Sequence, residues 1–173
     1  MMPNHVVNEI RLHHTEAEKA RSVVSGERGV IDFRTLLPLP KNYWPGSVSS
    51  QEQAAFPGTH LDAARETWGT KWNAYALSDA SFRVDGDDVV LTFETAWAPP
   101  RGWVVAVFST LECDITHYWQ DEGSEAVLLE KYTFSDSDPR WRSEEVEHGS
   151  PDHRRLFKLQ WGVETPAELE AEA

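Results

Sequence analysis

The sequence predicts a single α+β domain of split βαβ type, in which helices cover one face of an antiparallel sheet. Three observations support this prediction. The chain has 173 residues, a length that fits one domain. Several short segments alternate apolar with polar residues, as half-buried strands do. By contrast, residues 99–111 repeat their apolar side chains at helical spacing, which is typical of a helix that lies on a sheet.

The first predicted unit is a strand, a helix and a second strand. Residues 6–12 alternate between apolar and polar side chains, which predicts a strand. Thr15 and Glu18 have the spacing of a capping box, so we expect a helix over residues 15–25. Residues 31–34 are expected to form a second, short strand that ends before two prolines.

The next segment, residues 41–58, is expected to be a long loop, because it is rich in proline, glycine, serine and glutamine. The loop contains the aromatic residues Tyr43, Trp44 and Phe56. We expect these rings to be exposed, and they are candidate partner-binding residues.

The rest of the chain predicts a second series of strands and helices. The turn residues Gly86-Asp87-Asp88 separate two alternating segments, which indicates a hairpin. Pro99 and Pro100 suit the first turn of a helix. The predicted elements are a helix near 61–67, strands at 71–78, 81–85 and 89–95, a helix at 99–111, strands at 115–119 and 127–134, and a helix at 152–160.

The predicted domain covers residues 1–161, and its last part, residues 135–161, is a divergent, highly charged segment. Residues 162–173 form an acidic tail that we expect to be frayed.

Net charge and composition narrow the classes of function. The chain carries 29 acidic and 16 basic residues, a formal charge of −13, which disfavours a bare polyanion as partner. The acidic surface serves either solubility or the docking of a basic protein. The sequence contains one cysteine and no long apolar run or signal peptide, so we expect a cytoplasmic protein with no membrane segment.

Two tryptophan-bearing segments are the most informative motifs of the chain, at residues 68–73 and 93–100. One interpretation places Trp68 and Trp72 in the core, with Asn73 bridging backbone groups. The other places Lys71 and Asn73 on a surface flanked by indoles, where they would contact a ligand or partner. Lys71 and Asn73 are therefore candidate partner-binding residues.

These motifs resemble those of the YubB-type ferredoxin-like proteins of plasmids and bacteriophages, over roughly residues 1–135. The resemblance implies a ferredoxin-like fold without an iron–sulfur cluster and an origin in a mobile element, and it implies no activity. Asn73 departs from the family pattern, in which we expect an acidic residue. The segments that carry the resemblance are Met2-Pro3-Asn4, Ile31-Asp32-Phe33, Leu36-Leu37-Pro38-Leu39-Pro40, Trp68-Gly69-Thr70-Lys71-Trp72-Asn73 and Phe93 through Pro100.

The sequence contains no recognisable catalytic motif. A Gly-x-Ser-x-Gly elbow, a glycine-rich phosphate loop and paired histidines at metal-binding spacing are all missing. Cys113 lies between Glu112 and Asp114, whose charges disfavour a thiolate. We therefore expect a non-enzymatic protein with no catalytic residue, cofactor or metal, although the sequence leaves open a site that is assembled only in three dimensions.

Two hypotheses of function follow. The first is an accessory protein of a phage or mobile element that binds a host or element-encoded protein, for example one that acts in defence or nucleic-acid handling. The alternative is a nucleic-acid-associated regulator that uses residues 140–155, where Arg140 and Trp141 begin a basic–aromatic segment. Neighbouring carboxylates dilute that segment, so nucleic acid is the less favoured partner. Arg140 and Trp141 are also candidate partner-binding residues in the first hypothesis.

Overall fold

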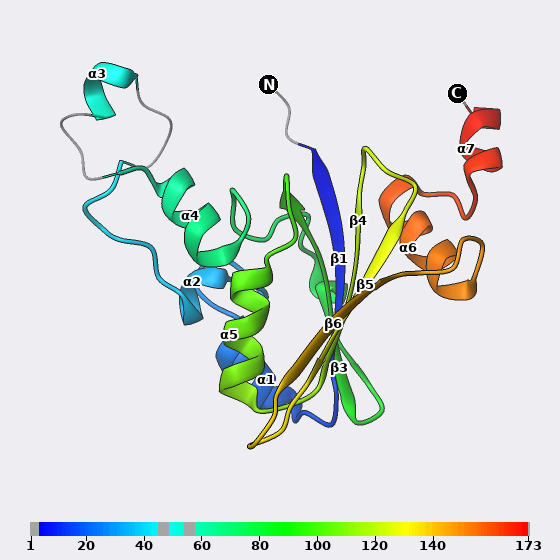
Figure 1. The fold of residues 1–173 in the computed structure, drawn as a ribbon, viewed down its shortest axis with the longest axis horizontal. Helices are drawn as coiled ribbons and strands as arrows, with labels where there is room; N and C mark the ends of the chain where they lie inside the picture. Colours follow the sequence, from blue (N-terminus) through cyan, green and yellow to red (C-terminus); the bar gives the residue numbers. More distant parts are fainter. Residues whose placement is uncertain (1–3, 45–48, 54–57, 173) are drawn as a thin grey trace.

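A six-stranded antiparallel sheet forms the centre of the computed structural model, which describes residues 4–44, 49–53 and 58–172 (Figure 1). The strand order is β2-β3-β1-β4-β5-β6. The strands are β1 (His5–Leu12), β2 (Phe82–Asp85), β3 (Asp88–Ala96), β4 (Ile115–Asp121), β5 (Val127–Thr133) and β6 (Arg140–Glu145).

The first four strands have the predicted split βαβ topology. β1 lies between β3 and β4 and pairs with both, so the first strand of the chain is central in the sheet. β5 and β6 extend the sheet beyond β4. The α-helices are α1 (Ala17–Val24), α2 (Phe33–Leu36), α3 (Ser50–Gln53), α4 (His60–Trp68), α5 (Arg101–Leu111), α6 (Pro151–Trp161) and α7 (Pro166–Glu172), and a 3-10 turn, η1 (Asp79–Ser81), precedes β2.

The main core lies between one face of the sheet and helices α1, α2, α4 and α5. Side chains alternate across a strand, so Ile10 and Leu12 of β1 point to this face while Val7 points to the other. Trp103 of α5 is fully buried and packs against Phe33 and Phe93. Burial of a side chain of this size stabilises the fold by roughly 2–3 kcal/mol.

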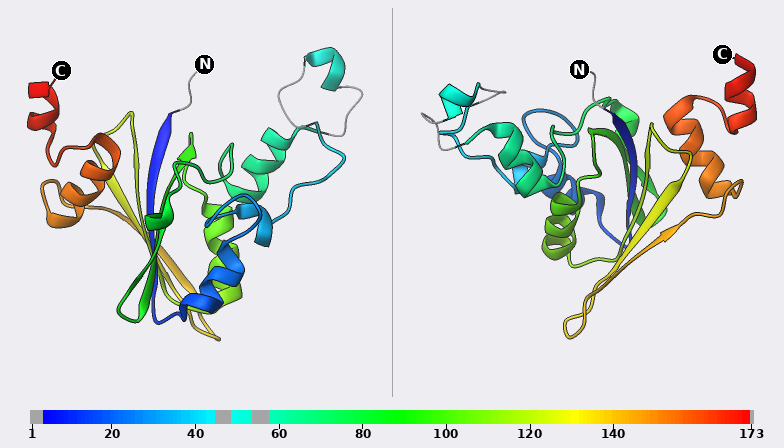
Figure 2. Two further views of the ribbon diagram at one scale, coloured as in Figure 1. Left: turned by 180° about the vertical axis from the view of Figure 1, so that it is seen from behind. Right: turned by 45° about the horizontal axis from the view of Figure 1, so that its top comes forward.

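Helix α6 lies on the opposite face of the sheet. Helices were predicted on one face alone, so this second covered face was not expected. Figure 2 shows the sheet between α6 and the four core helices. Leu156 of α6 packs with Val7 and Val127 in a small second cluster. The charged segment at 135–161 therefore contributes both a strand and a helix to the domain.

Two predictions near the N-terminus are wrong. Thr15 does not cap α1, because its hydroxyl donates to the carbonyl of His13 and the N-cap position is Glu16. Residues 31–34 do not form a strand. Asp32 instead caps α2, accepting a hydrogen bond from the backbone N–H of Arg34.

The structure also corrects later predictions. Residues 71–78 form no strand, and only Tyr75 makes an isolated bridge, with Glu94 of β3. The predicted loop at 41–58 contains the short helix α3, and the tail contains α7, so it is not frayed throughout. In the part of the chain that the structure describes, no helix is long and apolar enough to cross a bilayer.

Candidate functional site

The two tryptophan motifs come together at one end of the sheet. Ala96, the last residue of β3, accepts a hydrogen bond from the hydroxyl of Thr70 at 2.8 Å and one from the N–H of Lys71 at 3.4 Å. Gly69 ends α4 in the left-handed conformation, with φ of 90°, next to the first residues of α5. The motif at 68–73 is therefore fixed against the motif at 93–100.

Glycine is required where α4 and α5 meet. A Cβ atom at Gly102 would lie 2.3 Å from the carbonyl oxygen of Thr67, which is closer than van der Waals contact allows. The two helices thus approach backbone to backbone, and this contact positions the segment that follows α4.

The three tryptophans of the motifs have different environments. Trp68 is 1% exposed and donates its indole N–H to the carbonyl of Leu37, as the core interpretation predicts. Trp72 and Trp97 are 39% and 41% exposed, so the core interpretation is wrong for Trp72. Lys71 lies between the two exposed rings, with its Nζ 5.8 Å from the ring centroid of Trp72 and 6.0 Å from that of Trp97. We call Lys71, Trp72 and Trp97 the indole–lysine cluster.

Backbone strain accompanies the exposed ring of Trp97. This residue has φ of 73°, in the left-handed region that bulky side chains rarely adopt. Its N–H donates to the carbonyl of Asn4 at 2.9 Å, which holds the strained conformation in place. Strain of this kind costs of order 1–3 kcal/mol and persists where the surrounding structure fixes it.

Asn73 has the bridging role of the first interpretation, not the surface role of the second. Its Oδ1 accepts from the N–H of Phe33 at 2.9 Å, and its Nδ2 donates to Oδ1 of buried Asp32 at 2.8 Å. The amide therefore connects the tryptophan motif with the start of α2.

Tyr75, His5 and Glu94 continue the surface beyond the cluster. The ring of Tyr75 contacts the ring of Trp72, with centroids 6.0 Å apart. Nδ1 of His5 lies 2.8 Å from the Tyr75 hydroxyl and 3.3 Å from Oε2 of Glu94. Burial and the charges of Glu94 and Glu122 raise the pKa of Tyr75, so its hydroxyl stays protonated and donates to the carbonyl of Thr95.

A groove of about 510 Å³ starts beside Glu94 and runs across the sheet face that carries α6. Val7 and Glu94 lie on its floor, since they are paired across β1 and β3. Arg155 and Leu159 of α6 form one wall, and the segment at 76–81 lines the other side.

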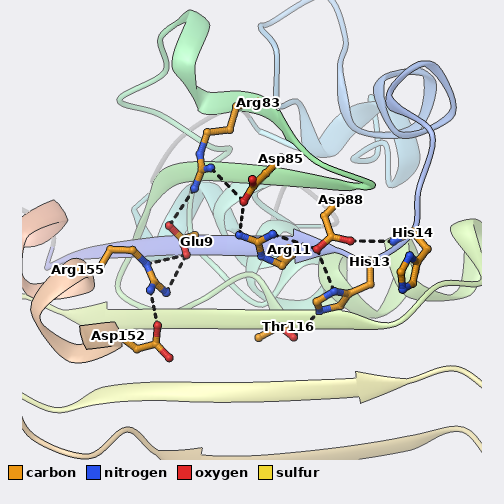
Figure 3. A network of polar contacts seen from close by, with 10 residues as sticks. All are labelled: Glu9, Arg11, His13, His14, Arg83, Asp85, Asp88, Thr116, Asp152 and Arg155. Atoms are coloured by element: carbon orange, nitrogen blue, oxygen red, sulfur yellow. Dashed lines mark hydrogen bonds and ion pairs between the residues drawn. The ribbon is translucent and has the colours of Figure 1, made fainter. Parts of the chain in front are cut away.

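Ion pairs cross the same sheet face (Figure 3). Glu9 of β1 is 5% exposed, and its carboxylate lies 3.0 Å from Arg155 of α6 and 3.7 Å from Arg83 of β2. Arg155 also pairs with Asp152. Because these cations are all paired with carboxylates, the network stabilises the position of α6 on the sheet and does not form a free anion site.

A buried polar cluster on the α5 face, centred on Glu130, was not predicted. The carboxylate of Glu130 accepts hydrogen bonds from Arg101 at 2.6 Å, Trp119 at 3.2 Å and Tyr132 at 2.8 Å, and His117 lies beside it. Burial alone would raise the pKa of Glu130, but the hydrogen bonds from Tyr132 and Arg101 and the charge of Arg101 lower it. Glu130 is thus an ionised structural group. Strand alternation could have placed it on the buried face.

The aromatic residues predicted in the loop at 41–58 are not all exposed. Trp44 is exposed, whereas Tyr43 is half-buried against the main core. Phe56 lies outside the described residues. The structure thus leaves Trp44 as a candidate surface residue of this segment.

The predicted basic–aromatic segment is divided between two elements. Arg140 and Trp141 lie on β6, and Arg140 pairs with Asp138. Arg155 lies on α6 and is paired with Glu9 and Asp152. Trp141 is 56% exposed and borders a cavity of about 270 Å³ that lies against α5. Arg140 and Arg155 of the predicted segment therefore do not form one unpaired basic surface.

A comparison with protein families supports the fold. Residues 67–147 match the model of the ferredoxin-like domain in Api92-like protein. The chain therefore carries a ferredoxin-like domain, as predicted, and the match covers just under half of the sequence and includes both tryptophan motifs. The resemblance was expected over residues 1–135, so the matched segment starts later and ends further along the chain. No curated protein and no solved structure matches the chain.

Proposed function

We propose that this protein is a non-enzymatic binding protein that recognises a protein partner through the indole–lysine cluster. In this proposal it is an accessory protein of a phage or other mobile element, similar to the YubB-type proteins. Its partner is a host or element-encoded protein, for example one that acts in defence or in nucleic-acid handling.

The observation that carries the proposal is the position of Lys71 between two exposed indoles. Tryptophan is enriched among the residues that dominate the free energy of protein–protein binding. Both rings are attached to backbone that side-chain hydrogen bonds of Thr70 and Asn73 hold in place. A rigid surface loses little conformational entropy on binding, which favours affinity.

The net charge of −13 favours a basic partner. Glu94 and Glu122 lie near Tyr75, so carboxylates adjoin the aromatic surface. If long-range attraction steers the encounter, the association rate constant falls as the salt concentration rises.

The alternative function, a nucleic-acid-associated regulator, has weaker support. Single-stranded nucleic acid requires cations that are free to neutralise phosphates. Arg140 and Arg155 are both engaged by carboxylates of the same chain. A mobility-shift assay with single-stranded DNA tests this alternative, and a shift that Arg140→Glu together with Arg154→Glu abolishes would favour it.

Capture of partners from a bacterial host lysate tests the main proposal. We expect the wild-type protein to retain a specific protein that the variants Trp72→Ala and Trp97→Gly lose, with dissociation constants raised about 30-fold or more. Glycine is chosen at position 97 because it tolerates the positive φ.

Trp44→Ala and Trp141→Ala are the matched controls, since each removes an exposed indole elsewhere. Capture that is unchanged in both cluster variants, or lost only in the controls, contradicts the assignment of the binding surface.

A further inference from the structure

The β6 strand ends the sheet, and its outer edge has no partner among the residues that the structure describes. All six of its residues are exposed. An exposed edge offers unpaired backbone N–H and C=O groups to another strand.

The charges of β6 are divided between its two ends. Arg140 and Arg142 lie in its first half, and Glu144 and Glu145 lie in its second half. When two copies of such a strand run antiparallel, the basic half of each faces the acidic half of the other. The strand is therefore complementary to itself.

Backbone geometry restricts the registers in which two copies can pair. In an antiparallel pair, opposed residues either both direct their N–H and C=O groups at each other or both direct them away. These directions alternate along a strand. The residue numbers of two opposed residues in a pair of β6 strands must therefore differ by an even number, or be equal. In each allowed register, one residue therefore lies opposite its own copy, and the two-fold axis passes between the two. Ser143 is one residue that can take this position.

Only the register centred on Ser143 places Arg142 opposite Glu144 of the second copy, twice in the dimer. The neighbouring allowed registers place Arg142 or Glu144 opposite its own copy, where like charges repel. In the Ser143 register, Trp141 faces Glu145 of the second copy. The small Ser143 lies at the axis.

Within the monomer, the surroundings of Arg142 also favour an acidic residue on the neighbouring strand. Arg142 is directly opposite Lys131 of β5, a like-charge pair within the sheet. Glu144 lies 3.0 Å from Nζ of the same lysine. A Glu144 from a second copy would add a carboxylate beside Arg142 and offset this repulsion.

We propose that two copies of this protein form a two-fold symmetric dimer through antiparallel pairing of their β6 strands, centred on Ser143. The dimer is an isologous assembly in which one sheet continues across both chains. The indole–lysine cluster contains no β6 residue, so the pairing of the two strands does not involve its three side chains.

Charge reversal tests the dimer in the full chain. Arg142→Glu and Glu144→Arg each place like charges in both cross-strand pairs, so each raises the dimer dissociation constant by about tenfold or more. An equimolar mixture of the two variants restores both pairs and forms a heterodimer. Sedimentation or light scattering measures the mass, and Arg154→Glu, an exposed reversal on α6, is the control with no effect.

Cross-linking tests the register. In a Cys113→Ala background, Ser143→Cys forms an intermolecular disulfide on mild oxidation, because opposed Cα atoms lie about 4.5–5.5 Å apart. Glu145→Cys does not, since it faces Trp141. A wild-type chain that stays monomeric at millimolar concentration, a dimer that neither reversal weakens, or cross-linking through position 145 instead of 143 overturns the proposal.

Discussion

His117 lies 3.8 Å from Glu130, measured from Nδ1 to Oε2, and neither side chain is exposed. Asn8 uses its amide nitrogen to donate to Thr95, so its Oδ1 accepts from Nε2 of His117. The imidazole is therefore held as the Nε2-protonated tautomer, and its Nδ1 has no hydrogen-bond partner among the described residues. Burial lowers the pKa of His117 to about 4, although the charge of Glu130 opposes this shift.

This shift predicts that stability falls in mild acid. The unfolded chain binds a proton at His117 below about pH 6.5, whereas the folded protein binds it only near pH 4. The contribution of neutral His117 to the free energy of unfolding is complete above pH 6.5 and is lost progressively as the pH falls to 4. We expect the free energy of unfolding to decrease by roughly 3 kcal/mol over this window.

Urea unfolding of wild type and His117→Gln at several pH values measures the effect. The glutamine variant should lack this part of the pH dependence, and exposed His148→Gln should keep it. Parallel curves for wild type and His117→Gln would show that His117 is not the group responsible.

The contact of Gly102 with Thr67 predicts a strong effect of a single methyl group. Gly102→Ala would force α4 and α5 apart, because the new Cβ meets a backbone carbonyl that cannot rotate away. We expect a loss of about 1–3 kcal/mol in thermal or urea unfolding. Ser109→Ala, on the exposed side of the same helix, serves as the control and should change stability little.

The hydrogen bond from Asn73 to Asp32 predicts that a charge at position 73 destabilises the fold. Asn73→Asp replaces the donor to Asp32 by a second carboxylate, so two negative charges would lie about as close as the present hydrogen-bonded atoms. We expect a loss of roughly 1–3 kcal/mol at pH 7 that becomes smaller in acid, where the pair gains a proton. Asn73→Ala should lose stability without this pH dependence, and an equal pH profile for both variants would contradict the explanation.

The tryptophans predict a separation between stability and binding. Trp68→Ala removes a buried indole and should cost about 3–5 kcal/mol in unfolding experiments. Trp72→Ala removes an exposed ring and should cost less than about 1 kcal/mol while it reduces partner capture. A large loss of stability in Trp72→Ala would indicate that this ring is structural after all.

Much of the fold was predictable because its main elements have strong local signals. The hairpin of β2 and β3 has turn residues between two alternating segments, and α5 has an apolar stripe at helical spacing. β6 was missed since all of its residues are exposed, so an edge strand of this kind shows no alternation between apolar and polar side chains. The position of α6 on the second face depends on a distant contact with Val7.

The candidate site was only partly predictable. Lys71 was placed on a surface flanked by indoles, and the structure has this arrangement. The second indole is Trp97, from the other motif, and their proximity depends on the pairing of residues 70 and 71 with the end of β3. For Asn73 both a bridging and a surface interpretation were open, and the bridging one agrees with the structure, but its partner Asp32 is 41 residues away and could not be predicted from local sequence.

The central place of β1 has a consequence for any fragment of this protein. β1 lies outside the segment at 67–147 that matches the ferredoxin-like model, yet it bridges β3 and β4. A polypeptide trimmed to the matched segment would be left with two ribbons, β2-β3 and β4-β5-β6, that have no strand to join them. The sheet of the matched segment is therefore incomplete without the N-terminal strand, and excision at the boundary of sequence similarity would expose the edges of β3 and β4 to aggregation.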